Sequence, residues 1–186
     1  MSIATPTKSQ ECSTNTICAV LDHTVTLAYE TNRQCNDVLH DFVNKLSKKG
    51  QSHQYYAENR GTNSRKAARD NFLGKKSEVF VAMYLRDNRK FPNITVDVEI
   101  REGAGKKWQV DLPFSEKDAE YPGVHVKACL ESITELADDY TWTFQWANKS
   151  GRGGQDEIFT GPDSDLVAFV TMKEPEDPEG IIRAIM

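Results

Sequence analysis

The sequence has no long hydrophobic run. No apolar segment approaches the roughly 20 residues that a membrane-spanning helix needs. Residues 1–20 also lack the basic segment followed by an apolar one that is typical of a secretory signal peptide. We therefore expect neither a membrane span nor a signal peptide, and we expect a soluble, cytoplasmic protein.

Cysteine is scarce, and the chain has only Cys12, Cys18, Cys35 and Cys129. No two of them form a CxxC pair, which favours reduced thiols over a disulfide framework. Cys12, Cys18 and His23 lack a second Cys/His pair at a suitable spacing, and this argues against a zinc site.

The residues that are present suffice for one folded domain. Hydrophobic residues make up 38% of the 186 residues and charged residues 27%, a balance that supports a buried core. The net charge is −5, but residues 33–90 carry a net +7 and residues 91–186 a net −10. This division fits a phosphate-binding surface beside a cation-binding site, and it fits a solvated basic face equally well.

The first part of the chain contains one clear helix. Residues 1–16 are rich in Ser and Thr and predict a flexible arm. Residues 17–30 mix β-branched and apolar residues without a clean period, so a helix and a strand both remain open. Residues 34–49 place apolar side chains at helical spacing and end in a basic turn before Gly50, which predicts an amphipathic helix.

A second helix is predicted over residues 67–88, where an apolar stripe is interrupted at Gly74. The polar connector before it, residues 51–66, interleaves tyrosines with Arg and Lys, a mixture that suits nucleic-acid contact. We assign residues 17–66 to a helical extension for dimerisation or DNA grip, and residues 67–186 to the main core.

Beyond Pro92 the apolar period changes to that of β-strands. Strands are predicted at residues 94–100, 107–112, 124–129, 140–146 and 166–172. The last of these is almost continuously apolar, which is typical of a strand covered on both faces. The tail that follows predicts a surface segment with a last helical turn. Helices followed by strands indicate a mixed α/β domain.

Two of these strands bring chemical groups together. If 107–112 and 124–129 pair as a hairpin with their apolar side chains in the core, Asp111 and Lys127 emerge on the same opposite face. His125 shares that face. Glu78 lies on the helix before the first strand, flanked by Lys75 and Lys76.

These segments resemble the PD-(D/E)XK nuclease superfamily, which has the restriction-endonuclease-like fold. The resemblance covers residues 65–173 and is carried by Glu78 in GKKSEVFVAMYL, Asp111 in KKWQVDLPF, the HVK of YPGVHVKAC and the downstream strand SDLVAFVTM. It departs from the family at His125, where a second carboxylate is usual. The resemblance implies a mixed sheet flanked by helices as the nuclease core, with the N-terminal helical extension added to it.

The resemblance also implies a Mg²⁺-dependent site in which Mn²⁺ can replace Mg²⁺. Asp111 would be the central ligand, assisted by Glu78 and the main-chain carbonyl of Val126. Lys127 would orient or deprotonate the attacking water, and His125 would act as a ligand, directly or through water, or as a proton acceptor. Each residue also has a structural interpretation: a turn residue at Asp111, a helix surface charge at Glu78, a packed imidazole at His125 and an edge-strand charge at Lys127.

The function that the resemblance implies is site-specific cleavage of double-stranded DNA by a homodimer, like a type II restriction enzyme. A junction-resolving, homing or degradative nuclease of the same superfamily remains open, as does an inactive DNA-binding or partner-binding module on the same fold. An acidic protein-interaction domain is a further alternative. The basic residues expected to contact DNA are Arg60, Arg65, Lys66, Arg69, Lys75, Lys76, Lys106, Lys107, Lys149 and Arg152.

Overall fold

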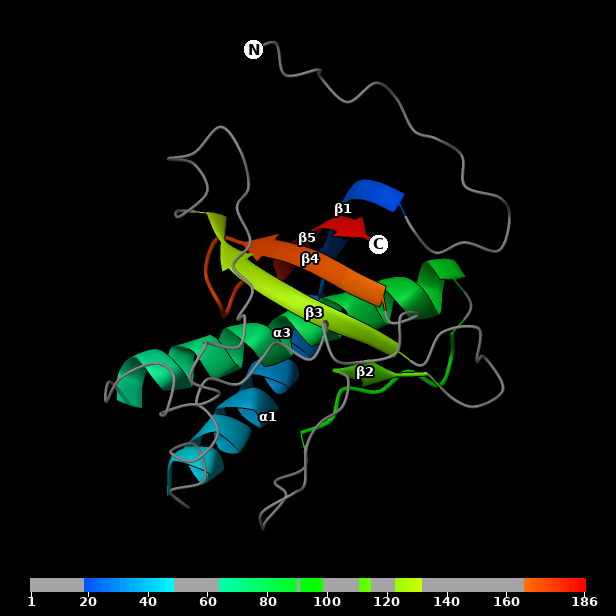
Figure 1. Cartoon of the computed structure of the whole chain (residues 1–186). Helices are drawn as coiled ribbons and strands as arrows, with labels where there is room; N and C mark the ends of the chain where they lie inside the picture. The colour runs from blue at the N-terminus through cyan, green and yellow to red at the C-terminus, as the bar shows by residue number, and fades with distance from the viewer. Residues whose placement is uncertain (1–18, 49–63, 90, 99–110, 115–122, 132–165) are drawn as a thin grey trace, which may run out of the picture.

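The computed structural model describes residues 19–48, 64–89, 91–98, 111–114, 123–131 and 166–186. These residues form a mixed five-stranded sheet and two helices (Figure 1), which confirms the mixed α/β class. The elements in chain order are β1 (Ala19–Thr26), α1 (Tyr29–Lys48), α3 (Ser64–Arg89), β2 (Leu112–Pro113), β3 (Gly123–Leu130), β4 (Leu166–Met172) and β5 (Glu179–Ile185).

The strand order across the sheet is β1-β5-β4-β3-β2. β3 and β4 run parallel, and the other neighbouring pairs in this sheet are antiparallel. β2 pairs antiparallel with β3 through Leu112 opposite Val124 and Pro113 opposite Gly123, so the predicted pairing of these two segments is confirmed at these residues. β4 lies in the middle of the sheet and is buried along nearly its whole length, as its apolar sequence predicts.

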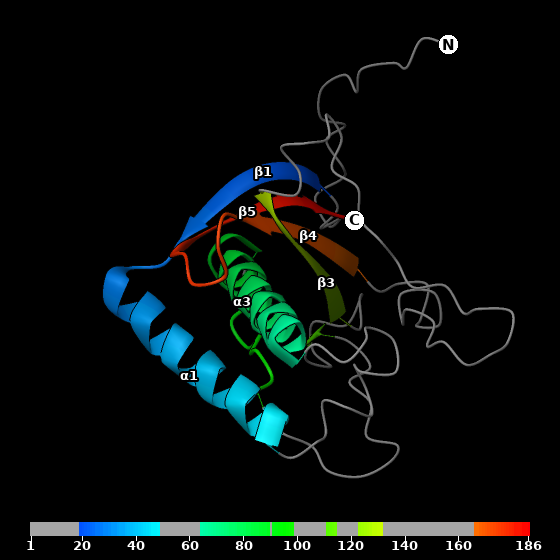
Figure 2. The ribbon, with the colours of Figure 1, turned by 90° about the vertical axis from the view of Figure 1, so that its left-hand side faces the viewer.

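Helix α1 is amphipathic and packs against α3 (Figure 2). Glu30 places a negative charge in its first turn, where the helix dipole favours one. The helix predicted from residue 34 is confirmed as far as Lys48, and it begins earlier, at Tyr29. The buried side chains of α1 form a small cluster with Phe72 of α3; they are Leu39, Phe42, Val43 and Leu46.

Helix α3 lies between α1 and the sheet and is therefore buried on two sides (Figure 2). Phe72 faces α1, whereas Phe80, Val81 and Leu85 belong to the main core beneath the sheet and are 0% exposed. Gly74 does not interrupt the helix, and a Cβ at that position would meet no atom within 4 Å. The second predicted helix is thus confirmed as one continuous element.

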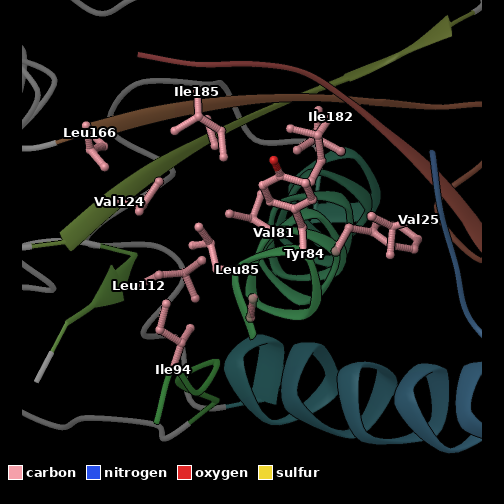
Figure 3. Packing of buried hydrophobic residues seen from close by; sticks show 14 of the residues in the cluster. Val25, Val81, Tyr84, Leu85, Ile94, Leu112, Val124, Leu166, Ile182 and Ile185 are labelled. Carbon is pink, nitrogen blue, oxygen red and sulfur yellow. The ribbon is translucent and has the colours of Figure 1, made fainter. Parts of the chain in front are cut away.

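The main core joins α3 to the strands of the sheet (Figure 3). A Cβ at Gly180 of β5 would overlap the ring of Phe80, so glycine allows the strand to approach the helix closely. Figure 3 shows side chains from both layers meeting in this core; the labelled residues contributed by the strands are Val25, Leu112, Val124, Leu166, Ile182 and Ile185.

Two predicted strands need correction, and one segment that the sequence leaves open is resolved. Residues 94–98 are not a strand: Ile94 and Val96 pack into the main core and Val98 packs into the α1–α3 cluster, so their apolar alternation serves burial rather than strand pairing. Residues 19–26, for which the sequence leaves helix and strand open, form β1. The strand predicted to end at Leu112 instead continues to Pro113, and its residues 107–110 lie outside the described residues.

The C-terminal tail is wrongly predicted as a surface segment with a helical turn. Residues Glu179–Ile185 form β5, which lies between β1 and β4. Both sheet registers of β5 shift at Arg183. This irregularity lets Ile182 and Ile185 both be 0% exposed, although a regular strand would point them to opposite faces. The missing alternation is the reason that the sequence pattern does not reveal this strand.

Several predictions fall outside the described residues, namely the arm at 1–16, most of the connector at 51–66 and the strand at 140–146. The division into a 17–66 extension and a 67–186 core stays a prediction, although the first described part of that extension is the strand β1 rather than a helix. Neither α1 nor α3 is apolar enough to be a candidate membrane span.

Candidate functional site

The candidate site begins at Glu78, which α3 carries toward the hairpin side of the sheet. Its side chain is 5% exposed, and Lys75, one helical turn earlier, places its Nζ 2.8 Å from Glu78 Oε2. The Lys75 side chain is also nearly buried, with 11% exposed. The surface-charge interpretation of Glu78 is therefore wrong, because this carboxyl group is buried against the Lys75 ammonium.

Asp111 stands immediately before β2 and contacts the backbone of β3. Its Oδ2 accepts a hydrogen bond of 2.7 Å from the amide nitrogen of Val126, the middle residue of HVK. Because Leu112 pairs with Val124, Asp111 lies where the continued register would place it across from His125. The sequence prediction that Asp111 adjoins the HVK strand is confirmed.

Electrostatics link Glu78 to Asp111. Burial raises the pKa of Glu78 to about 8; the nearby Lys75 ammonium lowers it, while the negative charges of Asp111 and Asp97 raise it further. Asp97 is a residue that sequence reasoning misses. Its place in the alternating segment 94–98 predicts only a polar strand position, and nothing in its spacing connects it to Glu78.

His125 and Lys127 lie on β3 at alternate positions. Val124 and Val126 contribute to the main core beside α3, so His125 and Lys127 turn toward the other face of the sheet. His125 is 5% exposed and Lys127 is partly buried. Glu78 and Asp111 thus come together at the hairpin, and Asp111 binds the strand backbone between the two other predicted residues.

A second polar cluster, which the sequence does not reveal, lies at Arg183 of β5. Arg183 Nε donates to Thr171 Oγ1 at 2.9 Å, and its Nη1 lies 3.0 Å from Asp22 Oδ1. Its Nη2 lies 3.5 Å from Glu131 Oε1. Asp22 has a φ of 41° where the β1–β5 register is irregular. These contacts connect β1, β4, β5 and the residue that follows β3. They form where the strand register is irregular, and an irregular register leaves no sequence pattern.

Two of the residues predicted to contact DNA, Lys75 and Lys76, have side chains that are buried or nearly so. Lys75 is engaged with Glu78, and Lys76 is 0% exposed. Lys76 Nζ donates to the amide oxygens of Asn32 and Asn36 on α1. Burial lowers the pKa of Lys76. The Lys76 ammonium is enclosed because α3 is covered on two sides rather than one, and the Lys75 ammonium is nearly buried against Glu78.

The other predicted DNA contacts stand as follows. Arg65 is exposed, and Arg69 is 55% exposed with its Nη2 3.1 Å from Glu174 Oε2. The side chain of Lys66 is not described. Those predicted contacts that lie outside the described residues are Arg60, Lys106, Lys107, Lys149 and Arg152.

The described part of the chain contains no group of three or more His, Cys, Asp or Glu side chains placed to hold a metal ion. Glu78 and Asp111 are the two carboxyl groups that the sequence prediction assigns to a metal ion, and the negative charge of Asp111 acts on Glu78. Of the discounted zinc residues, His23 packs edge-on against Tyr84 with ring centroids 4.9 Å apart, and Cys12 and Cys18 lie outside the described residues.

Comparison of the chain with protein-family models, with curated proteins and with solved structures finds no match.

Proposed function

We propose that this protein is a Mg²⁺-dependent DNA endonuclease of the PD-(D/E)XK type. The observation that carries the proposal is the contact of Asp111 with the backbone of Val126, made beside the buried Glu78 of α3. A helix carboxylate and a hairpin carboxylate thus lie beside the backbone of the HVK strand, while the His125 and Lys127 side chains turn toward the other face of the sheet. The mixed sheet with α3 packed against it is compatible with such a core.

The residues at this place fit Mg²⁺ chemically. Mg²⁺ is commonly held by one or two carboxylates, with water and phosphate oxygens completing its coordination. Glu78 and Asp111 would supply the two carboxylates, and the carbonyl of Val126 would add a third oxygen. When bound, the ion would polarise the scissile phosphate and offset the charge that develops during hydrolysis.

The remaining roles belong to side chains of β3. Lys127 would orient the attacking water and offset negative charge on the phosphate. The buried His125 would accept a proton or hold water near the scissile phosphate. Arg65 and Arg69, on the first turns of α3, would contact DNA phosphates. A homodimer that cuts both strands at a specific site is the proposed assembly.

One observation favours a second candidate, a DNA-binding or partner-binding module without catalysis. His125 is 5% exposed and stands where the family usually has a carboxylate. A buried imidazole is suited to packing as well as to chemistry.

A cleavage assay with variants separates these candidates. Plasmid and phage DNA are incubated with Mg²⁺, Mn²⁺ or EDTA and with wild-type protein, Lys127→Ala or the exposed control Lys173→Ala. Discrete metal-dependent bands that Lys127→Ala loses and Lys173→Ala keeps would support a site-specific endonuclease. A smear would support a degradative or structure-selective nuclease. DNA binding without cleavage or metal effect would support the binding module.

A further inference from the structure

Lys75 is the cationic side chain that contacts Glu78. Its ammonium lies 2.8 Å from the carboxylate, and both side chains are almost fully buried. A buried ammonium is stable only where a carboxylate or other oxygen atoms replace its hydration. The ammonium of the neighbouring Lys76 is stabilised by neutral groups instead, because it donates to the amide oxygens of Asn32 and Asn36.

The surroundings of Glu78 hold more negative than positive charge. Asp111 and Asp97 both act on Glu78 through space, whereas Lys75 is the cation that acts on it. Asp111 is also held by the amide of Val126, which fixes one of its oxygens on the strand. Glu78 therefore has one cation and two further carboxyl groups acting on it, and this arrangement attracts a second cation or a more highly charged one.

We propose that Lys75 holds the cation position beside Glu78 in the metal-free protein, and that a divalent cation displaces its ammonium to reach that carboxylate. The inference rests on the proposed function, because the displacing ion is the one that the nuclease reaction requires. Lys75 then occupies the cation position beside Glu78 until metal arrives, and it weakens metal binding by competition.

The first test follows the exposure of Lys75 in the wild-type protein. The protein is acetylated with a lysine-directed reagent, with and without saturating Ca²⁺, and labelling at each lysine is read by mass spectrometry. Calorimetry measures Ca²⁺ binding in parallel. We expect labelling of Lys75 to rise several-fold with Ca²⁺, because the displaced ammonium leaves its buried partner. Labelling of Lys76, the matched buried control, should stay low in both conditions.

The outcomes separate this inference from the proposed function. Bound Ca²⁺ with unchanged labelling of Lys75 would overturn the displacement and leave the metal-dependent nuclease standing. An absence of Ca²⁺, Mg²⁺ and Mn²⁺ binding would overturn both. An equal rise at Lys75 and Lys76 would indicate general loosening of α3 and would also overturn the displacement.

The second test measures competition directly. Binding of Mn²⁺ is titrated for the wild type, Lys75→Met and Lys75→Arg by electron paramagnetic resonance. We expect Lys75→Met to bind Mn²⁺ several-fold more tightly than the wild type, and Lys75→Arg to resemble the wild type because the competing positive charge is kept. Equal or weaker binding by folded Lys75→Met would contradict the inference. Circular dichroism checks folding, and if Lys75→Met does not fold, the labelling of the wild-type protein decides.

Discussion

Burial determines the chemistry of three charged residues on α3. Glu78, Lys75 and Lys76 all read as surface charges in a polar helical sequence, yet all three side chains are buried or nearly so. Each is compensated differently, by an ion pair for Lys75 and Glu78 and by amide oxygens for Lys76. The consequence for function is that these charges of α3 are directed inward, toward the hairpin and α1.

The raised pKa of Glu78 predicts a pH dependence of stability. The unfolded chain releases this proton near the ordinary value of 4.5, whereas the folded protein holds it until the pKa of about 8. Between these values the folded state binds more protons, so the free energy of unfolding falls as pH rises. Glu78→Gln, which cannot titrate, should flatten this part of the profile.

Urea unfolding of both proteins at several pH values from about 5 to about 8 measures the effect. The wild type should lose stability relative to Glu78→Gln as the pH rises. Parallel profiles for the two proteins would show that Glu78 has the same pKa in the folded and unfolded chains.

The elements divide into those that have a regular period and those that do not. α1, α3, β3 and β4 were predictable because their apolar residues recur at the spacing of a helix or strand, or fill the strand entirely. β5 was missed because the bulge at Arg183 breaks its alternation. Residues 94–98 alternate like a strand but pack into the two clusters without pairing, and alternation alone cannot distinguish these two kinds of burial.

Two Gly→Ala substitutions should have opposite effects on stability, because Gly180 lies against α3 and Gly74 has open space around it. At Gly180 the added methyl group would overlap the Phe80 ring, so Gly180→Ala should lower the free energy of unfolding by about 1–3 kcal/mol. At Gly74 the methyl group meets nothing, so Gly74→Ala should raise it by about 0.5–1 kcal/mol through helix propensity. Denaturant unfolding measures both, and destabilisation of equal size at the two positions would contradict this packing.

At the scale of the whole molecule, the sequence predicts that Asp111 lies beside the HVK strand, and the structure shows this contact. The meeting of Asp111 with HVK followed from the apolar alternation of two strands, which fixes the hairpin. The ion pair of Lys75, the approach of Asp97 and the burial of Lys76 did not follow, because they depend on α3 being enclosed between α1 and the sheet. Which elements enclose a helix is a tertiary property that no local spacing contains.

Lys75 and Lys76 are buried or nearly so, and they therefore do not contribute to an exposed basic face on residues 33–90. Arg65→Ala should weaken DNA binding and reduce the slope of log affinity against log salt by about one. Arg86→Ala is the matched control, because it removes the same exposed charge near the other end of α3. Fluorescence anisotropy over a salt series measures both, and equal losses would mean that DNA does not favour the first turns of α3.

The central claim is that Asp111 and its neighbours support metal-dependent hydrolysis of DNA. The most direct measurement is the rate at which supercoiled plasmid disappears with wild-type protein or Asp111→Asn, in Mg²⁺ and in EDTA. The substituted side chain keeps an amide oxygen that can accept the hydrogen bond from the Val126 amide, so the fold should persist while the negative charge is lost. We predict cleavage by the wild type in Mg²⁺ alone and none by the variant. Intact plasmid with folded wild-type protein, or equal cleavage by Asp111→Asn, would contradict the account.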